Sequence, residues 1–159
     1  MFTIIFVYTI IVMKDIVPNK NIIARNTIIA CMKSGNWVHD RIAEVLKEHD
    51  LSLQQFNVLR ILRGQKGQPA NLNTIQEHMI AKMSNTTRLV DKLLLKKLVA
   101  RNVCEKNRRK VEIFITEKGL QLLTILDPII TTTEQKIVAI YTPEELQTLN
   151  TLLNKLRTQ

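Results

Sequence analysis

Apolar residues recur along most of this chain at the three- and four-residue spacing of amphipathic helices. The first such stretch predicts a long helix over residues 22–49, with a break expected at residues 34–36, where a glycine lies between polar neighbours. A second helix is expected to begin at Ser52, because Ser52 and Gln55 have the spacing of a capping box. Its apolar side would consist of Phe56, Leu59, Ile61 and Leu62, and the glycines and proline of residues 64–69 would end it.

Two further helices are expected close together. Residues 71–80 predict a short one, capped by Asn73 or Thr74, and residues 81–83 a tight turn. Ser84 would cap the next helix, whose two faces differ in character. The apolar face comprises Leu89, Val90, Leu93 and Leu94. The polar face comprises Ser84, Asn85, Arg88, Asp91 and Lys92.

The pattern then changes from helical spacing to the alternation typical of strands. Residues 98–103 and 111–115 predict two strands, and the basic stretch 105–110 predicts the hairpin loop that joins them. A short helix, a tight turn, a second helix and a basic hairpin together predict a winged helix-turn-helix. The fold class is therefore expected to be mainly α, of the α+β winged helix-turn-helix type.

The last part of the chain predicts two more helices. Thr116 would cap a long helix reaching about residue 141, bent near Pro128 because proline removes a backbone donor. Thr142, with proline and acids after it, predicts the final helix start. In that helix Leu146, Leu149, Leu153 and Leu156 form an apolar stripe. Such a stripe must pack on another helix or on a second subunit.

The beginning of the chain does not fit this pattern. Residues 2–13 are almost entirely apolar, too short to span a bilayer as a helix, and without the basic segment and cleavage site of a signal peptide. The alternatives are a start site assigned too early, with Met13 and Met32 as other starts, a segment packed on the fold or on a dimer partner, or attachment to a membrane. No stable membrane span is expected, and with two cysteines in no disulfide or ligand spacing we expect a cytoplasmic protein.

Charge is concentrated in the middle of the chain. Residues 82–110 hold ten of the 23 Lys and Arg residues and two acids, a net charge of +8, whereas the other 130 residues hold 13 basic and 12 acidic residues. This concentration favours a polyanionic partner, and duplex DNA suits a helix with hydroxyl, amide and guanidinium groups on its exposed face. The residues expected to contact DNA are Lys82, Ser84, Asn85, Thr86, Thr87, Arg88, Lys92, Lys106, Arg108, Arg109 and Lys110.

With these elements placed, the sequence resembles the multiple-antibiotic-resistance regulator (MarR) family of winged helix-turn-helix transcriptional regulators. Residues 84–93 are similar to the family's recognition helix, and residues 107–119 to its wing, the following strand and the start of the long helix. Arg109 takes the place of the wing arginine that enters the minor groove. Two departures concern this region: Asn107 replaces the wing acid, and Lys97 replaces the glycine that usually ends the recognition helix.

The resemblance implies how the chain is organised. Residues 1–21 would be an atypical extension and residues 22–159 a single MarR-like domain, with a DNA-binding lobe at about 52–116 flanked by dimerisation helices at about 22–49 and 117–158. It further implies a homodimer on a pseudo-palindromic operator, acting as a repressor relieved by a small amphipathic or aromatic ligand. No cofactor is expected. Trp37, His39 and Arg41 are candidate ligand-lining residues, and for Trp37 a place in the core is the alternative.

Other functions fit the sequence less well. His39, His49 and His78 show no metal spacing, and the chain has neither a glycine-rich phosphate loop nor a nucleophile elbow, so no enzyme is expected. A thiol-based redox sensor of the same fold remains an alternative because of Cys31 and Cys104, although either cysteine could simply pack in the fold. A winged helix used for protein or RNA contacts is the third reading.

Overall fold

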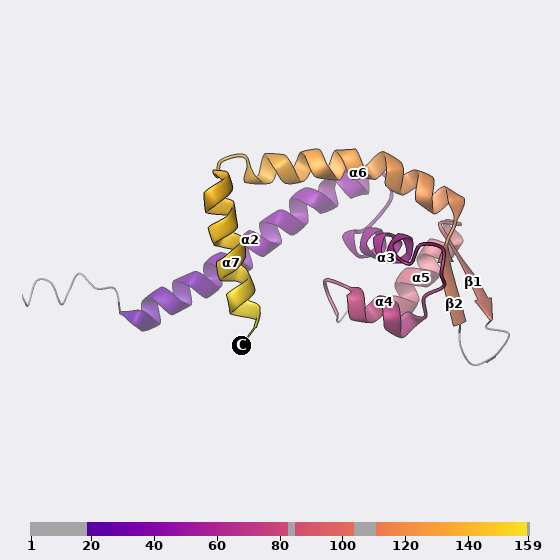
Figure 1. Cartoon of the computed structure of the whole chain (residues 1–159), viewed down its shortest axis with the longest axis horizontal. Coiled ribbons are helices and arrows are strands. Elements are labelled where there is room, and N and C mark those ends of the chain that lie inside the picture. Colours follow the sequence, from indigo (N-terminus) through magenta and orange to yellow (C-terminus); the bar gives the residue numbers. More distant parts are fainter. Residues whose placement is uncertain (1–18, 83–84, 104–110, 159) are drawn as a thin grey trace, which may run out of the picture. The chain divides into compact units, whose positions relative to one another are not determined.

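The computed structural model describes residues 19–82, 85–103 and 111–158, and Figure 1 shows its helices and strands. The apolar stretch 2–13, Ser84, Cys104 and the wing-loop residues Lys106, Arg108, Arg109 and Lys110 lie outside the described residues. The elements in order are α2 (Lys20–Lys47), α3 (Leu53–Gly64), α4 (Leu72–His78), α5 (Thr86–Leu95), β1 (Val99–Val103), β2 (Val111–Ile115), α6 (Glu117–Val138) and α7 (Pro143–Arg157). The mainly helical fold class with a β-hairpin is confirmed.

The chain divides into two compact units, Met1–Val38 and His39–Gln159. In the first unit the described residues from Lys20 onward belong to α2, and large apolar side chains of this part of the helix are exposed; Ile22 and Met32, for example, are 56% and 65% exposed. The break expected at residues 34–36 is wrong, because α2 is continuous through Gly35. A single glycine costs a helix only about 1 kcal/mol, and the residues on either side maintain the helix.

The second unit contains the hydrophobic core, with α3 at its centre. Helix α3 packs against α4, α5, α6 and β2. Its expected apolar side is confirmed for Phe56, Leu59 and Leu62, which are buried, whereas Ile61 is only partly buried. The buried residues that surround α3 are Leu46, Leu51, Ala70, Ile75, Met79, Val90, Leu93, Leu98, Val99, Ile113, Leu123, Leu126 and Ile130.

Side-chain caps fix where the helices begin. The capping box at Ser52 is confirmed: the Ser52 hydroxyl accepts from the Gln55 amide at 3.2 Å, and the Gln55 Oε1 accepts from the Ser52 amide at 3.0 Å. The expected caps of α4 were wrong, because α4 begins two residues earlier, with Asn71 Oδ1 accepting from the Thr74 amide at 2.9 Å. The Thr142 capping box of α7 is confirmed. Near it, hydrogen bonds from the backbone amide of Glu144 and from Thr142 lower the pKa of Glu144.

The hairpin is an antiparallel pair in which Val99 lies opposite Ile115 and Val103 lies opposite Val111. Ala70, just before α4, extends this pair, because its amide donates to the Ile113 carbonyl at 3.0 Å and the Ile113 amide donates to the Ala70 carbonyl at 2.9 Å. The segment that leads into α4 is thereby attached to the hairpin. This attachment fixes the helix-turn-helix against the base of the wing.

Helix α5 ends in a left-handed turn. Lys97 adopts a φ of 59°, and the Leu98 amide donates to the Leu93 carbonyl at 3.0 Å, the pairing of a Schellman motif. Lysine thus takes the conformation for which the resembling family uses glycine, at a modest cost in backbone strain. The burial of Leu98 next to it offsets this cost.

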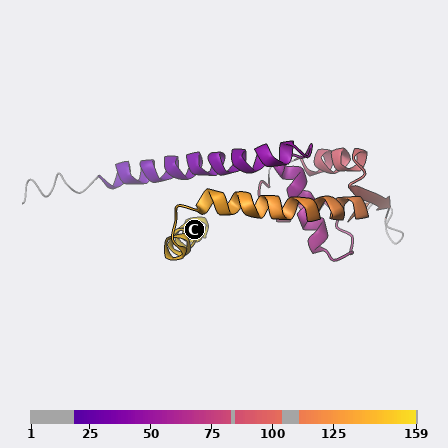
Figure 2. The same cartoon turned by 90° about the horizontal axis from the view of Figure 1, so that it is seen from above.

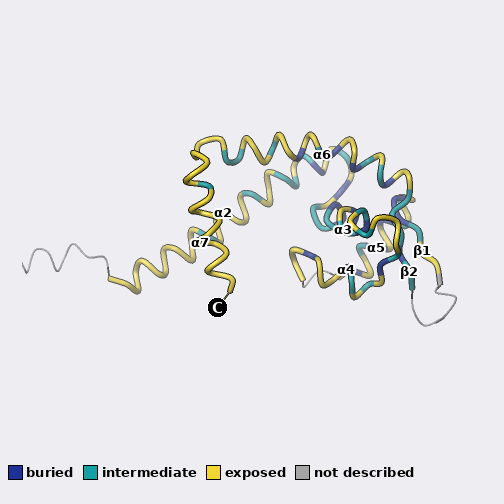
Figure 3. Tube along the Cα trace, in the orientation of Figure 1, coloured by how far each residue is buried: buried dark blue, intermediate teal, exposed yellow. Residues whose placement is uncertain are grey.

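Helices α6 and α7 differ in how far they are buried. Helix α6 continues through Pro128 as one helix (Figure 2), and the bend expected there stays a prediction. It carries the buried Leu123, Leu126 and Ile130. An Arg63–Asp127 ion pair joins it to α3. Helix α7 has no buried residue, and Leu149, Leu153 and Leu156 are each about 40% exposed (Figure 3). Across the described ranges no helix has the length and apolarity needed to cross a membrane.

Substitution Gly119→Ala tests the close packing of α6 on the end of α5. A Cβ at Gly119 would lie 2.4 Å from the Leu98 carbonyl oxygen and 2.8 Å from Ile115 Cγ1. Because a backbone oxygen cannot move aside easily, we expect a loss of about 1–3 kcal/mol in the free energy of unfolding, measured by urea denaturation. The control is Gly64→Ala, where a Cβ meets nothing within 4 Å. Equal midpoints for the two variants would contradict the close approach.

Candidate nucleic-acid interface

Helix α5 buries one face and exposes the other. Val90 and Leu93 are fully buried on the core side. The N-cap is Asn85, whose Oδ1 accepts from the Arg88 amide at 3.0 Å, so the cap expected at Ser84 was placed one residue too early. Because the carboxamide of Asn85 caps the helix, α5 begins at Thr86.

Five of the six described residues that the sequence predicts to contact DNA are exposed. Asn85, Thr87, Arg88 and Lys92 are exposed on α5, and Lys82 is exposed in the turn before it. Among the described residues, neither Arg88 nor Lys92 forms an ion pair. The face therefore presents hydroxyl, amide and positively charged groups together, all accessible to a partner.

Thr86 is the exception and requires a correction. The sequence placed it among the residues expected to contact DNA, but the residue is only 6% exposed. The reason is its spacing: Thr86 lies four and seven residues before Val90 and Leu93, so it shares the buried face of α5 with them. Thr86 is therefore a residue of the fold and not of the exposed face.

An ion pair joins the exposed face of α5 to the hairpin. Arg101 of β1 donates to the Asp91 carboxylate at 2.8 Å, with the two side chains 35% and 52% exposed. Since both are partly solvated, the pair adds at most about 1 kcal/mol to stability. The pair also changes the charge of this face, because it neutralises Asp91, the one acid of α5. No role for Arg101 was predicted from the sequence. The feature that could have indicated one is Asp91, an acid on a basic helix with no evident partner.

The expected ligand-lining residues are not brought together around a described cavity. Trp37, in the first unit, is 49% exposed, and His39 and Arg41, in the second, are exposed beside their neighbours Asp40 and Glu44. Their role stays a prediction. Cys31 is a half-buried free thiol, and within the described ranges no group of His, Cys, Asp and Glu side chains could hold a metal ion.

The arrangement of α4, the turn, α5 and the hairpin β1–β2 defines a winged helix-turn-helix protein. The MarR family model matches residues 51–111, which include all of these elements up to the first residue of β2. The transcriptional regulator MhqR of Bacillus subtilis is 27% identical over 118 residues, which are 74% of this chain and 80% of the relative. The expected resemblance to the MarR family of transcriptional regulators is confirmed.

Two solved structures share the fold. A MarR-like transcription regulator from Bacillus cereus ATCC 10987 superposes with a TM-score of 0.78 at 19% identity, over 86% of this chain and 96% of that one. A MarR variant from E. coli, solved in complex with operator DNA, superposes with a TM-score of 0.74 at 22% identity, over 86% and 96% of the two chains. At these identities the likeness concerns the fold.

The neighbouring threonines of α5 provide a matched test of its register. Thr86→Ala removes a buried side chain and should lower the free energy of unfolding by about 1–2 kcal/mol, whereas Thr87→Ala removes an exposed one and should change it by less than about 0.5 kcal/mol. Urea denaturation of both variants measures the difference. If Thr87→Ala proved the more destabilising, α5 would bury a different face.

Proposed function

We propose that this protein binds double-stranded DNA sequence-specifically and regulates transcription, with α5 as the helix that enters the major groove. The observation that carries the proposal is the exposed face of α5, where Arg88 and Lys92 lie beside Thr87 with no competing ion pair among the described residues. The dimensions of the major groove admit such a helix, and its base edges offer acceptors for these donors. The operator complex of the E. coli MarR variant, which has this fold, supports the proposal.

Each side chain on this face has a distinct contribution. The Arg88 guanidinium can donate two parallel hydrogen bonds to a guanine, the commonest specific contact in the major groove. Lys92, one turn further along, suits a phosphate as a point charge. Asn85 is more restricted: its Oδ1 is occupied by the Arg88 amide, so its Nδ2 can donate but the residue cannot make the two-bond contact with adenine while it caps α5.

The proposed wing contacts come from the stretch that the sequence identified. Residues 104–110 connect β1 to β2, and α5 packs against β1. Lys106, Arg108, Arg109 and Lys110 all belong to this connection. Positive side chains on a wing next to the recognition helix would contact the phosphates beside the groove and, for Arg109, the minor groove itself.

Arg88→Ala tests the proposed groove contact. Bound duplexes are first selected from a random DNA pool, and affinity for the enriched site is then measured by fluorescence anisotropy. We expect Arg88→Ala to weaken binding to that site by about 1–3 kcal/mol, or 5- to 150-fold, and to relax the preference at one base position. The control Lys66→Met removes a charge just after the end of α3, at a residue outside the expected DNA contacts, and should change affinity little. An equal loss on every sequence would make Arg88 a phosphate contact.

We also propose that the protein acts as a homodimer. On α7 the side chains of Leu146, Leu149, Leu153 and Leu156 line an apolar groove of about 600 Å³ together with Asn150 and Arg157, and none of them is buried within one chain. Leucines at three- and four-residue spacing pair helices by interdigitation. A two-fold dimer would present two α5 helices to a pseudo-palindromic operator, about one turn of DNA apart.

Leu153→Glu tests the dimer. A carboxylate in the leucine stripe would be buried without a partner on pairing, so we expect sedimentation to show a shift from dimer to monomer. The control Gln147→Glu adds the same charge to the same helix outside the stripe, where the side chain is exposed, and should leave the dimer intact. A dimer unaffected by Leu153→Glu would exclude the α7 stripe as the interface.

The regulation that we propose is repression relieved by a small ligand. A regulator that occupies its operator as a dimer blocks transcription simply by being bound, and a ligand that favours a different state of the protein would release it.

A further inference from the structure

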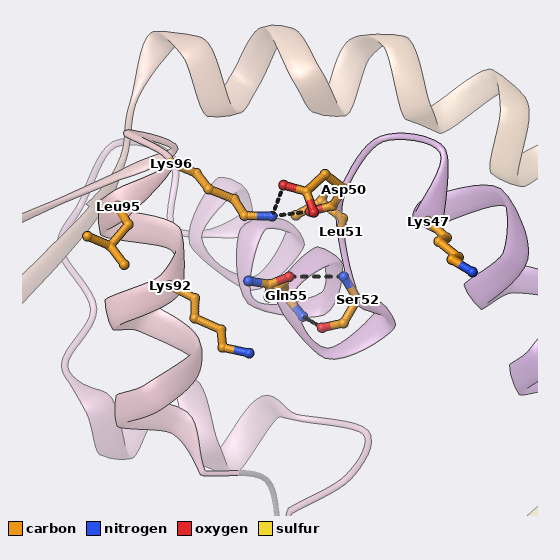
Figure 4. Close-up of a pocket in the computed structure, with 8 residues that line it drawn as sticks. All are labelled: Lys47, Asp50, Leu51, Ser52, Gln55, Lys92, Leu95 and Lys96. Carbon is orange, nitrogen blue, oxygen red and sulfur yellow. Dashed lines mark hydrogen bonds and ion pairs between the residues drawn. The ribbon is translucent and has the colours of Figure 1, made fainter.

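Two acids lie beside the positively charged residues of α5, and each is held by a cation outside the expected DNA contacts. The Asp91 carboxylate, on α5 itself, accepts from Arg101 of β1 at 2.8 Å. The Asp50 carboxylate, just after α2, accepts from the Lys96 ammonium at 2.8 Å. Figure 4 shows that Lys96, and not the neighbouring Lys92, reaches Asp50. Lys92 therefore stays without an ion pair among the described residues.

Asp91 has a second candidate partner on its own helix. Arg88 precedes it by three residues, a spacing at which side chains on a helix surface are neighbours and opposite charges pair. The same spacing does produce an ion pair in α2, where Arg41 and Glu44 approach to 3.4 Å. In α5, however, Asp91 pairs with Arg101, and Arg88 has no ion pair among the described residues. Arg101 thus occupies the acid that would otherwise compete for Arg88.

The position of Arg101 explains why it pairs with Asp91. Arg101 lies opposite Ile113 in the hairpin, and Ile113 is fully buried and also pairs with the backbone of Ala70. The strand that carries Arg101 is therefore held by the core. Its side chain is only 35% exposed, so it has already lost part of its freedom, whereas the exposed Arg88 would have to give up more side-chain entropy to pair.

The competition matters because a guanidinium cannot use the same donors twice. An arginine that pairs with a carboxylate through two parallel hydrogen bonds uses the edge that would face a guanine. An unpaired Asp91 carboxylate would in addition repel the phosphates of DNA, since like charges oppose each other across an interface. Both effects disappear while Arg101 holds Asp91.

We propose that Arg101 is a positioning residue for DNA recognition, which holds the Asp91 carboxylate so that the Arg88 guanidinium stays free for a base in the major groove. This inference rests on the proposed function and extends it to a residue of β1 that does not itself touch DNA. Two other roles would use the same ion pair. A structural pair would only anchor α5 to the hairpin, and a direct contact would place Arg101 on a phosphate.

Three variants distinguish these roles: Arg101→Met, Asp91→Asn and the double variant. Affinity for the selected duplex is measured by fluorescence anisotropy. We expect Arg101→Met to weaken binding at least about threefold, because Asp91 is then available to Arg88 and to oppose the phosphates. Asp91→Asn should bind at least as tightly as the wild type. The double variant should return to within about twofold of the wild type, because the competing acid is gone.

Each of the other roles gives a different pattern. If Asp91→Asn weakens binding as much as Arg101→Met does, the pair is a structural anchor and the proposal is overturned. A double variant as weak as Arg101→Met makes Arg101 a direct DNA contact, which also overturns it. Unchanged affinity in Arg101→Met overturns it as well.

Base preference gives a readout that a structural role would not change. The selection from a random pool is repeated with Arg101→Met and with the double variant. We expect Arg101→Met to relax the preference at the same base position as Arg88→Ala, and the double variant to restore it. A loss spread evenly over all positions overturns the connection with Arg88.

Arg63→Met is the matched control. Arg63 pairs with Asp127, and the side chains are 36% and 39% exposed, so the control removes one charge and one partly solvated ion pair, as Arg101→Met does. Its affinity should stay within about twofold of the wild type. Unfolding midpoints show which variants are folded, and Arg101→Gln has the same expected result if Arg101→Met is not.

The wild-type chain separates this proposal from the proposed function. A wild type that binds no duplex overturns the proposed function and the role of Arg101 with it. A wild type that binds its selected duplex, together with an Arg101→Met variant that binds equally well, overturns the role of Arg101 alone.

Discussion

The structure depends on one junction, where the chain leaves α5, forms the hairpin and enters α6. The Leu98 carbonyl accepts from the Thr116 amide at 3.1 Å, and the Thr116 hydroxyl donates to the Lys97 carbonyl at 2.9 Å while capping α6. Gly119 allows α6 to approach the backbone at Leu98. Because the end of one helix serves as the docking point for the next, the hairpin must close between them. The position of the wing relative to α5 follows from this closure.

The exposed face of α5 is fixed by contacts behind it. Val90 and Leu93 pack in the core, and Asn85 caps the start of the helix. Arg101 of β1 forms an ion pair with Asp91. These constraints leave the positive side chains as the exposed groups of the face. Lys92 lies at its edge and also lines a cavity at the start of α3.

Local signals in the sequence predicted the elements well, because a cap or an alternating pattern acts over a few residues. Ser52 with Gln55, Thr116 and Thr142 were all placed correctly as helix starts. The errors were shifts of one to two residues, at Asn71 and Asn85, where several polar residues compete for the cap. Thr86, expected to contact DNA, is buried instead, since it lies four and seven residues before Val90 and Leu93 on the same face of α5.

By itself the sequence determined the winged helix-turn-helix, the concentration of positive charge and the polar face of α5. Each of these depends on residues that are near one another along the chain. Only the tertiary structure decided which charges are neutralised and which remain available. The pairing of Asp91 with Arg101 and of Asp50 with Lys96 joins residues 10 and 46 positions apart. The cavity lined by Lys47, Gln55 and Lys92 likewise depends on tertiary packing, because these residues come from three helices that no local pattern connects.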